Sequence, residues 1–148
     1  MPLTRATVPP QPTSVRTSAP GIDVAALVDR LRGDDPTVRA AATEELRAVD
    51  PEVSRPLLLA LLDHPSPDLR IRALDLIDRT PQPEVEAALI ALLEQEPSAN
   101  VCGCVLDLLA EVGTPATLPA IRAVRLRFAD TPFIAFAADL ALRQIAAG

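Results

Sequence analysis

The sequence is poor in aromatic residues. It contains no tryptophan, no tyrosine and three phenylalanines, so aromatic residues make up 2% of the 148 positions, whereas apolar residues make up 49%. Any hydrophobic core must therefore be built from leucine, isoleucine, valine and alanine. Leucine and alanine favour helix, and no segment alternates apolar with polar residues as a half-buried strand does. The composition therefore predicts an all-α protein.

Lysine is absent too, and all 14 basic residues are arginines, which we attribute to genome composition rather than to function. The formal net charge of −6 argues against a dedicated nucleic-acid-binding protein, because phosphate contacts need a basic surface. No apolar run is long enough for a membrane span, and the N-terminus lacks the apolar core of a signal peptide. We therefore expect a soluble, cytoplasmic, bacterial protein.

Residues 1–20 differ in composition from the rest. They carry five prolines, several serines and threonines, two arginines and no acidic residue. Such a segment cannot bury enough apolar surface to offset the entropy of ordering, so we predict a disordered tail at 1–20 and a repeat domain at 21–148. Pro9-Pro10-Gln11-Pro12 fits the loose pattern of polyproline ligands, which leaves a docking motif as the alternative to a plain tail.

The remainder of the chain repeats itself. A segment that begins at Asp35 recurs at Ser66, at Ser98 and, in a more divergent form, at Thr131, so the starts are 31, 32 and 33 residues apart. A period of this length is typical of stacked-repeat proteins. Each copy begins with a helix-capping residue, and in three copies proline follows at once, where its missing N–H costs nothing.

The periodicity predicts eight helices in four antiparallel pairs, whose apolar faces are buried when the pairs stack. The seventh helix is expected to run from Pro115 to about Phe128, with Pro119 in its first turn. The positions expected to face the core in the second helices are Val38, Ala42, Leu46 and Val49; Leu69, Ala73 and Ile77; Val101, Val105, Leu109 and Val112; and Ile134, Ala138, Leu142 and Ile145.

The repeats resemble short bacterial HEAT-like repeats, which also occur in phycobilin lyase subunits, through Asp35-Pro36-x-Val38-Arg39-x-x-Ala42-x-x-x-Leu46 and Ser66-Pro67-x-Leu69-Arg70-x-x-Ala73. The resemblance covers roughly residues 21–148 and implies an α-solenoid of about four helix pairs, a fold that hosts many functions. It also implies a structural ladder between neighbouring pairs, to which Asp35, Arg39 and Arg70 would belong. The third and fourth copies have Cys102 and Ala135 where this pattern has arginine. Ala135 is explained by its place in the last repeat, which has no following neighbour, whereas Cys102 is not explained.

A projection of the second helices at about 100° per residue places two rows of side chains away from the core. One row is acidic for three of its members, and the neighbouring row is mostly apolar. The resemblance implies that this is the concave face. The two interpretations are a solvated face and a shallow groove for a basic amphipathic helix or an extended Arg/Lys-rich segment. The rows are Glu44, Asp75, Asp107 and Leu140, and Ala40, Ile71, Gly103 and Phe136.

The last helix adds an apolar stripe formed by Phe133, Phe136 and Leu140, at spacings i, i+3 and i+7. An exposed stripe of this kind is either an interaction site or an unrecognised packing surface, covered by a tilt of the last pair or by the tail. The only basic cluster is Arg122, Arg125 and Arg127 in the preceding helix, which we interpret as a solvated face on the opposite side, with pairing to acids of a partner as the alternative.

Cys102-Gly103-Cys104 is the one motif that suggests chemistry. Two thiols at i and i+2 point about 200° apart on a helix, so they neither chelate one ion nor form an easy disulfide. Structural packing is the first interpretation, and a reactive Cys102 near a helix N-terminus is the second. His64, the single histidine, is interpreted as a turn residue. Because no catalytic set is present, we predict no enzyme and no cofactor or metal.

The sequence thus predicts a protein–protein interaction scaffold or adaptor, such as an assembly factor or regulatory subunit. The expected partner is another protein with a basic or amphipathic segment, with self-association as a further option. The alternatives are a phycobilin-lyase-like subunit and a thiol redox or metal module at Cys102 and Cys104. The candidate partner-binding residues are Glu44, Ile71, Asp75, Asp107, Phe133, Phe136 and Leu140.

Overall fold

A computed structural model describes residues 23–148, which form eight α-helices, one short 3₁₀ helix and no strand. The predicted all-α fold and the count of eight helices are therefore confirmed for this part of the chain. The predicted tail at 1–20, with its polyproline-like motif, lies outside the described residues. The described residues divide into two compact units, the first ending at Ser54 and the second spanning Arg55–Gly148.

The first unit contains α1 (Val24–Leu31), α2 (Pro36–Arg47) and the first turn of α3 (Pro51–Leu61). α1 and α2 pack against each other through leucines such as Leu27, Leu31 and Leu46, each at most 3% exposed. Val38, expected in this core, is 38% exposed. It lies in the first turn of α2, one turn before Ala42 and about 40° off its direction.

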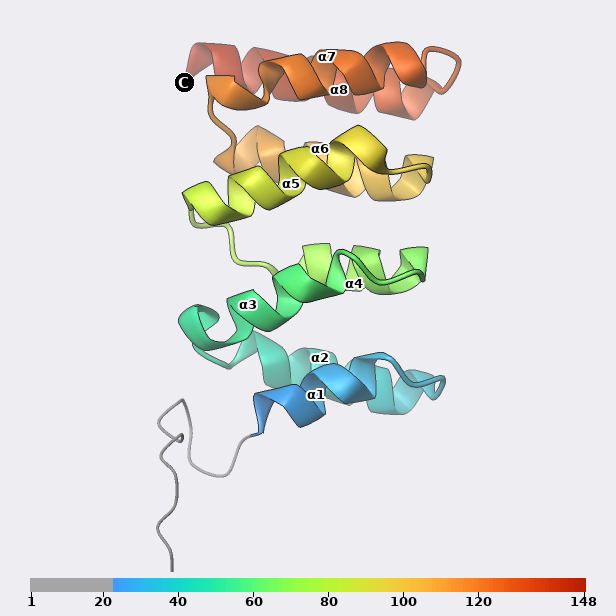
Figure 1. The fold of residues 1–148 in the computed structure, drawn as a ribbon, viewed down its shortest axis with the longest axis vertical. Helices are drawn as coiled ribbons and strands as arrows, with labels where there is room; N and C mark the ends of the chain where they lie inside the picture. The colour runs from blue at the N-terminus through green and yellow to red at the C-terminus, as the bar shows by residue number, and fades with distance from the viewer. Residues whose placement is uncertain (1–22) are drawn as a thin grey trace, which may run out of the picture. The chain divides into compact units, whose positions relative to one another are not determined.

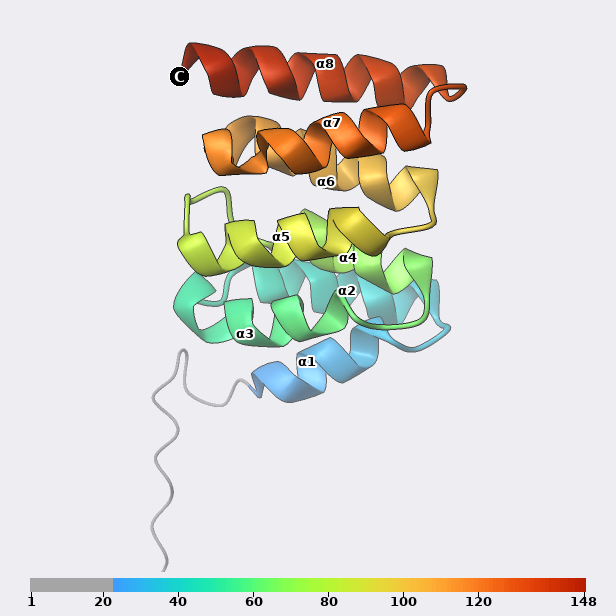
Figure 2. The same cartoon turned by 45° about the horizontal axis from the view of Figure 1, so that its top comes forward.

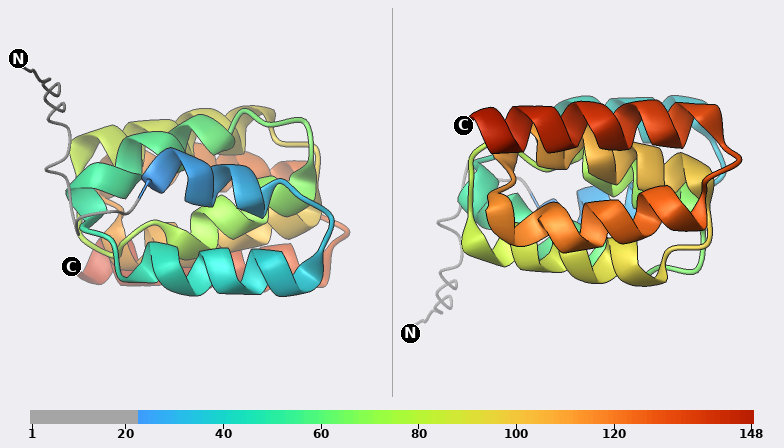
Figure 3. Two further views of the ribbon diagram at one scale, coloured as in Figure 1. Left: turned by 90° about the horizontal axis from the view of Figure 1, so that it is seen from below. Right: turned by 90° about the horizontal axis from the view of Figure 1, so that it is seen from above.

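The second unit continues with α4 (Pro67–Leu76), α5 (Pro83–Gln95), α6 (Ala99–Val112), the 3₁₀ turn η2 (Pro115–Thr117), α7 (Leu118–Arg127) and α8 (Pro132–Ala147). Within this unit, α6 packs between α4 and α8, and α5 packs against α6 and α7. The second helix of each pair (α4, α6, α8) thus forms one layer, and the first helices (α3, α5, α7) form the other (Figure 1; Figure 2). Figure 3 shows α7 and α8 in these two separate layers.

Side-chain caps begin the helices where the sequence places them. The Asp35 carboxylate accepts from the N–H of Thr37 at 2.9 Å, and Asp50 does the same for Glu52. Ser66 and Ser98 cap α4 and α6 in the same way. Each cap satisfies an N–H group that has no partner inside its helix. Thr131 makes no side-chain capping hydrogen bond, so α8 begins without one.

The core of the second unit is aliphatic, as expected. Val101, Val105 and Leu109 in α6 are fully buried, and Ile134 and Ala138 continue the core in α8. The core of α8 continues through fully buried Ala141 rather than Leu142, which is partly exposed. Ala141 is seven residues after Ile134 and about 20° from its direction, whereas Leu142 is about 80° away.

The predicted helix from Pro115 to Phe128 is divided in two. Pro115–Thr117 forms a 3₁₀ turn, and α7 starts at Leu118 with Pro119 in its first turn. A proline ring inside one continuous helix would clash with the carbonyl four residues earlier, that of Pro115. The Thr117 hydroxyl is buried at the break and donates to the Thr114 carbonyl at 2.8 Å. Of the helices in residues 23–148, none combines the length and hydropathy that crossing a bilayer demands.

Candidate functional site

The solvent side of α4, α6 and α8, which we call the second-helix face, carries two neighbouring carboxylates. Asp75 in α4 and Asp107 in α6 are exposed, and neither forms an ion pair or a side-chain hydrogen bond with a described residue. Burial first, and then the charges of Asp75 and Asp107, raise the pKa of the Cys104 thiol. Both carboxylates therefore act on the same thiol, which shows that α4 and α6 bring them to one place.

One positive charge on this surface, that of Arg79, lies close to another acid. Arg79 lowers the pKa of Cys104, but its Nε lies 3.6 Å from a carboxylate oxygen of Glu111. Asp75 and Asp107 therefore place two carboxylates without a paired cation on the second-helix face. An exposed charge of this kind attracts a partner of opposite sign and orients it as it approaches.

Aromatic side chains of α8 lie on the same layer. Phe136 is 67% exposed and Phe133 is 48% exposed. A Cβ placed on Gly103 would lie 3.3 Å from Cε2 of Phe133, so the Phe133 ring covers the α6 backbone where a side chain would otherwise stand. The expected stripe is thus fully open only at Phe136, because Phe133 packs on α6 and Leu140 is partly buried.

The remaining candidate residues are less prominent. Ile71 in α4 is partly buried, so it offers only part of its side chain to a partner. Glu44 is exposed and belongs to the first unit, where a carboxylate oxygen lies 3.7 Å from Nε of Arg47. The structure therefore brings Asp75 and Asp107 together, and it places Phe133 against the glycine of α6.

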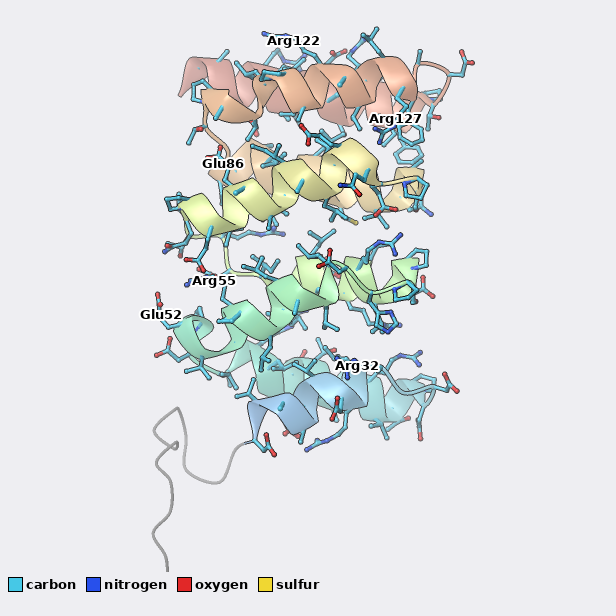
Figure 4. All side chains as sticks on the ribbon, viewed as in Figure 1. Arg32, Glu52, Arg55, Glu86, Arg122 and Arg127 are labelled. Carbon is cyan, nitrogen blue, oxygen red and sulfur yellow. The ribbon has the colours of Figure 1, made fainter. Side chains whose placement is uncertain are left out.

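The three arginines of α7 are all open to solvent to some degree, and two of them also have partners within the protein. Arg125 donates from Nε and Nη2 to the two carboxylate oxygens of Asp139 in α8, at 2.6 and 3.0 Å. These hydrogen bonds raise the pKa of Arg125 and lower that of Asp139. Arg122 is exposed (Figure 4), as expected for a solvated face.

Arg127 turns from the end of α7 toward the end of α5 (Figure 4). Its guanidinium donates to three backbone carbonyls: Leu93 at 3.0 Å, Glu94 at 3.3 Å and Glu96 at 2.9 Å. The last carbonyls of a helix lack partners inside the helix, so Arg127 acts as a C-terminal cap supplied by the next repeat. At the other end of these two helices, Glu86 accepts from the N–H and the hydroxyl of Thr114 at 2.6 and 2.7 Å.

The same carbonyl position is satisfied in three successive repeats. Arg39 donates to the Gly33 carbonyl at 2.9 Å, and Arg70 donates to the His64 carbonyl at 2.7 Å. In the third repeat the residue six positions after the carbonyl is Cys102, whose thiol lies 3.6 Å from the oxygen of Glu96. Arg127 supplies the missing guanidinium there, which explains why a cysteine can stand where the two preceding repeats have arginine.

The expected ladder of aspartate and arginine is also corrected. Asp35 accepts from backbone N–H groups of its own helix, and Arg39 donates to a carbonyl. Arg70 pairs instead with Glu96, which stands in the connection between α5 and α6 and is 2% exposed. Neither Glu96 nor the role of Arg127 could be predicted from the repeat pattern, because these residues do not recur at the matching positions of the other repeats.

The two thiols lie in different environments. Burial, against an opposing contribution from Arg127, raises the pKa of Cys102 to about 11, so the expectation that Cys102 is the more reactive thiol is wrong. The side chain is fully buried, and burial outweighs the helix N-terminus. Cys104 is partly exposed. Among residues 23–148, no three His, Cys, Asp or Glu side chains are grouped so that they could hold a metal ion.

His64 is held in the α3–α4 turn. Its Nδ1 accepts from the N–H of Ser66 at 3.0 Å, and its carbonyl accepts from Arg70. Both contacts order the turn ahead of α4, in keeping with the interpretation of His64 as a turn residue.

A family model for HEAT repeats matches residues 54–143, which is more than half of the chain. No curated protein and no solved structure gave a significant match.

Proposed function

The chain belongs to the HEAT-repeat family, and we propose that it is a protein-binding scaffold or adaptor whose second-helix face receives a basic or amphipathic segment of another protein. HEAT repeats generally mediate protein–protein interaction. In the more specific part of the proposal, the chain serves as an assembly factor or a regulatory subunit.

The observation that carries the proposal is the pair of exposed, unpaired carboxylates Asp75 and Asp107 on adjacent helices of one layer. A positively charged helix or extended segment would gain attraction from both, and the effect would weaken with salt because the charges are exposed. The apolar anchors would come from the same layer: Phe136 is open to solvent, and the partly exposed Phe133 and Ile71 add to it. Aromatic side chains are common anchors of protein interfaces. In this proposal Leu140 contributes the part of its side chain that remains exposed, and Glu44 is the acidic candidate of the first unit.

Charge reversal tests the acidic part of the surface. In a pull-down with the full chain, the variant Glu44→Lys/Asp75→Lys/Asp107→Lys should lose the partners that the wild-type chain retains. A matched control, Glu52→Lys/Glu84→Lys/Glu94→Lys, changes the net charge by the same amount at exposed positions of α3 and α5 and should retain them. Retention of every partner by the first variant would rule out the acidic surface as the binding site.

The apolar part has a separate test. Light scattering on the wild-type chain beside Phe136→Asp reports whether the exposed ring holds two copies together. A dimer that becomes a folded monomer would assign Phe136 to self-association and leave Asp75 and Asp107 to the partner. Two monomers of equal helicity would leave Phe136 open for a different protein.

The two alternatives have less support. Burial and the raised pKa of Cys102 argue against a thiol redox role for that residue. Within residues 23–148, no observation favours a phycobilin-lyase-like subunit over a binding scaffold, and the absence of tyrosine and tryptophan removes the usual stacking partners for a tetrapyrrole.

A further inference from the structure

The layer of first helices carries a hollow of its own, apart from the second-helix face. A cleft of about 540 Å³ opens between α3 and α5, next to the turns that follow these two helices. α3 and α5 are neighbours in this layer (Figure 2). The cleft belongs to the second unit and lies in a different layer from the second-helix face. Its volume falls within the range of sites that take small ligands or side-chain anchors, which is about 300–1,000 Å³.

The walls of the cleft are aliphatic. Leu59 and Leu62 line it from α3 and the residue after it, and Ala88, Ala91 and Leu92 line it from α5. Leu59, Ala88 and Leu92 are partly exposed and Ala91 is exposed, so apolar surface remains in contact with water. Covering that surface with an apolar side chain would be favourable.

The charged lining leaves one net negative charge. The charged lining residues are Asp63, Arg70 and Glu96. Arg70 and Glu96 neutralise each other through two hydrogen bonds of 2.8 and 2.7 Å. The Asp63 carboxylate is exposed and forms no ion pair or side-chain hydrogen bond with a described residue. The cleft therefore combines an aliphatic wall with a single free carboxylate at the α3–α4 turn.

A buried ion pair forms part of the lining of the cleft. The Arg70–Glu96 pair holds the start of α4 to the α5–α6 connection, and the Arg70 guanidinium also donates to the carbonyls of His64 and Pro65 at 2.7 and 3.1 Å. These bonds tie together the two turns that flank the cleft. Moving either turn would disturb a buried ion pair whose groups are hydrogen-bonded, which is costly. The two turns at the edge of the cleft are therefore fixed relative to each other.

We propose that the cleft between α3 and α5 is a second docking site, independent of the second-helix face, for a partner-protein segment in which an aliphatic anchor stands beside a lysine or arginine. The aliphatic side chain would fill the space between Leu59 and Leu92. The cation would pair with Asp63. The chain would then bind partners through both of its layers.

The probe for this site is a displayed library of random dodecapeptides, selected on the full chain. The enriched peptides are synthesised with a fluorescent label, and their dissociation constants are measured by fluorescence polarisation. The blocking variant is Ala91→Arg, which places a bulky cation on the cleft wall. The matched control is Ala87→Arg, an exposed position of the same helix outside the cleft. Circular dichroism establishes that both variants keep the helicity of the wild-type chain.

We expect enriched peptides that carry leucine, isoleucine or valine next to lysine or arginine. Their affinity should fall at least tenfold in Ala91→Arg, at least fivefold in Asp63→Lys, and less than twofold in Ala87→Arg. Asp107→Lys, on the second-helix face, should leave it unchanged, so the result does not depend on the function proposed above. Equal binding to the Ala91 and Ala87 variants would overturn the proposal. Peptides insensitive to Asp63→Lys, or no enrichment above a blank surface, would overturn it too.

Discussion

Arg70 and Glu96 form a buried, two-bond ion pair between α4 and the connection that precedes α6. Nε of Arg70 donates to Oε1 of Glu96 at 2.8 Å, and Nη2 donates to Oε2 at 2.7 Å. The side chains are 10% and 1% exposed. Oε2 of Glu96 also accepts from the N–H of Ser98 at 2.9 Å, and the Glu96 carbonyl accepts from Arg127. One residue therefore links three successive repeats.

Glu96→Gln should lower the free energy of unfolding by about 3 kcal/mol, because it leaves the Arg70 guanidinium buried without its counter-charge. Chemical denaturation monitored by circular dichroism measures the change. The control is Glu94→Gln, an exposed neighbour, which should stay within about 0.5 kcal/mol of the wild type. Replacement of both partners by Arg70→Met/Glu96→Leu should recover much of the loss. An unchanged stability for Glu96→Gln would contradict the role given to this pair.

Arg127→Ala should destabilise the protein by about 1–3 kcal/mol, because three carbonyls at the end of α5 lose their donor. Cys102→Arg alone should also destabilise, since the space is taken by Arg127. In the double variant Cys102→Arg/Arg127→Ala, the new arginine can donate to the Glu96 carbonyl. Arg39 and Arg70 donate in the same way to the carbonyls of Gly33 and His64.

We therefore expect the double variant to be more stable than the sum of the single changes predicts, by more than about 1 kcal/mol. Thermal and urea unfolding of the four proteins measure this coupling. Arg122→Ala, at an exposed position of the same helix, serves as the control and should change stability little. Strict additivity of the two changes would show that Cys102 and Arg127 do not share one role.

The Cys102 thiol should react slowly in the native protein. With a pKa of about 11, roughly a thousandth of the thiol is ionised at pH 8, compared with about a quarter for an ordinary cysteine. Its reaction with a disulfide reagent should accelerate about tenfold per pH unit as the pH rises toward that pKa. The Cys104→Ala variant isolates this thiol for measurement.

The same variant in denaturant provides the control and should react at the rate of a free thiol. Cys102→Ala, which leaves the partly exposed Cys104, should react faster than Cys104→Ala under native conditions. Rapid native labelling of Cys102 at pH 8 would show that its side chain is accessible.

Two glycines should respond to alanine in opposite ways. A Cβ on Gly103 would lie 3.3 Å from the half-exposed ring of Phe133, which can move, so Gly103→Ala should stabilise α6 by about 0.5 kcal/mol. A Cβ on Gly113 would lie 2.6 Å from the backbone oxygen of Leu109, which cannot move easily. Gly113→Ala should therefore cost about 1–3 kcal/mol. The denaturant concentrations at the midpoint of unfolding, measured for both variants and the wild type, test this prediction. A shift of the same sign in both variants would contradict it.

The helices and their starting points could be predicted from the sequence alone. Capping residues act within one turn of the chain, so Asp35, Asp50 and Ser66, each followed by proline, and Ser98 specify helix starts without reference to any neighbour. The buried stripe of α6 followed in the same way from the helical period, since Val101, Val105, Leu109 and Val112 recur at three- and four-residue spacing. Exposure of Asp75 and Asp107 followed from the same geometry. The amino-acid order thus determined a helical repeat protein with an acidic row.

Tertiary structure decided which polar groups meet. Arg70 reaches a glutamate 26 positions later in the chain, and Arg127 reaches carbonyls more than 30 positions earlier. Pairing at such separations depends on how neighbouring repeats pack, and no local pattern encodes it. The ionisation of Cys102 also depends on packing. Its position near a helix N-terminus favours the thiolate, but burial opposes the thiolate and dominates. The cleft beside Leu59 and Leu92 lies next to two turns that the Arg70–Glu96 ion pair ties together, an arrangement that residue types and spacing do not encode.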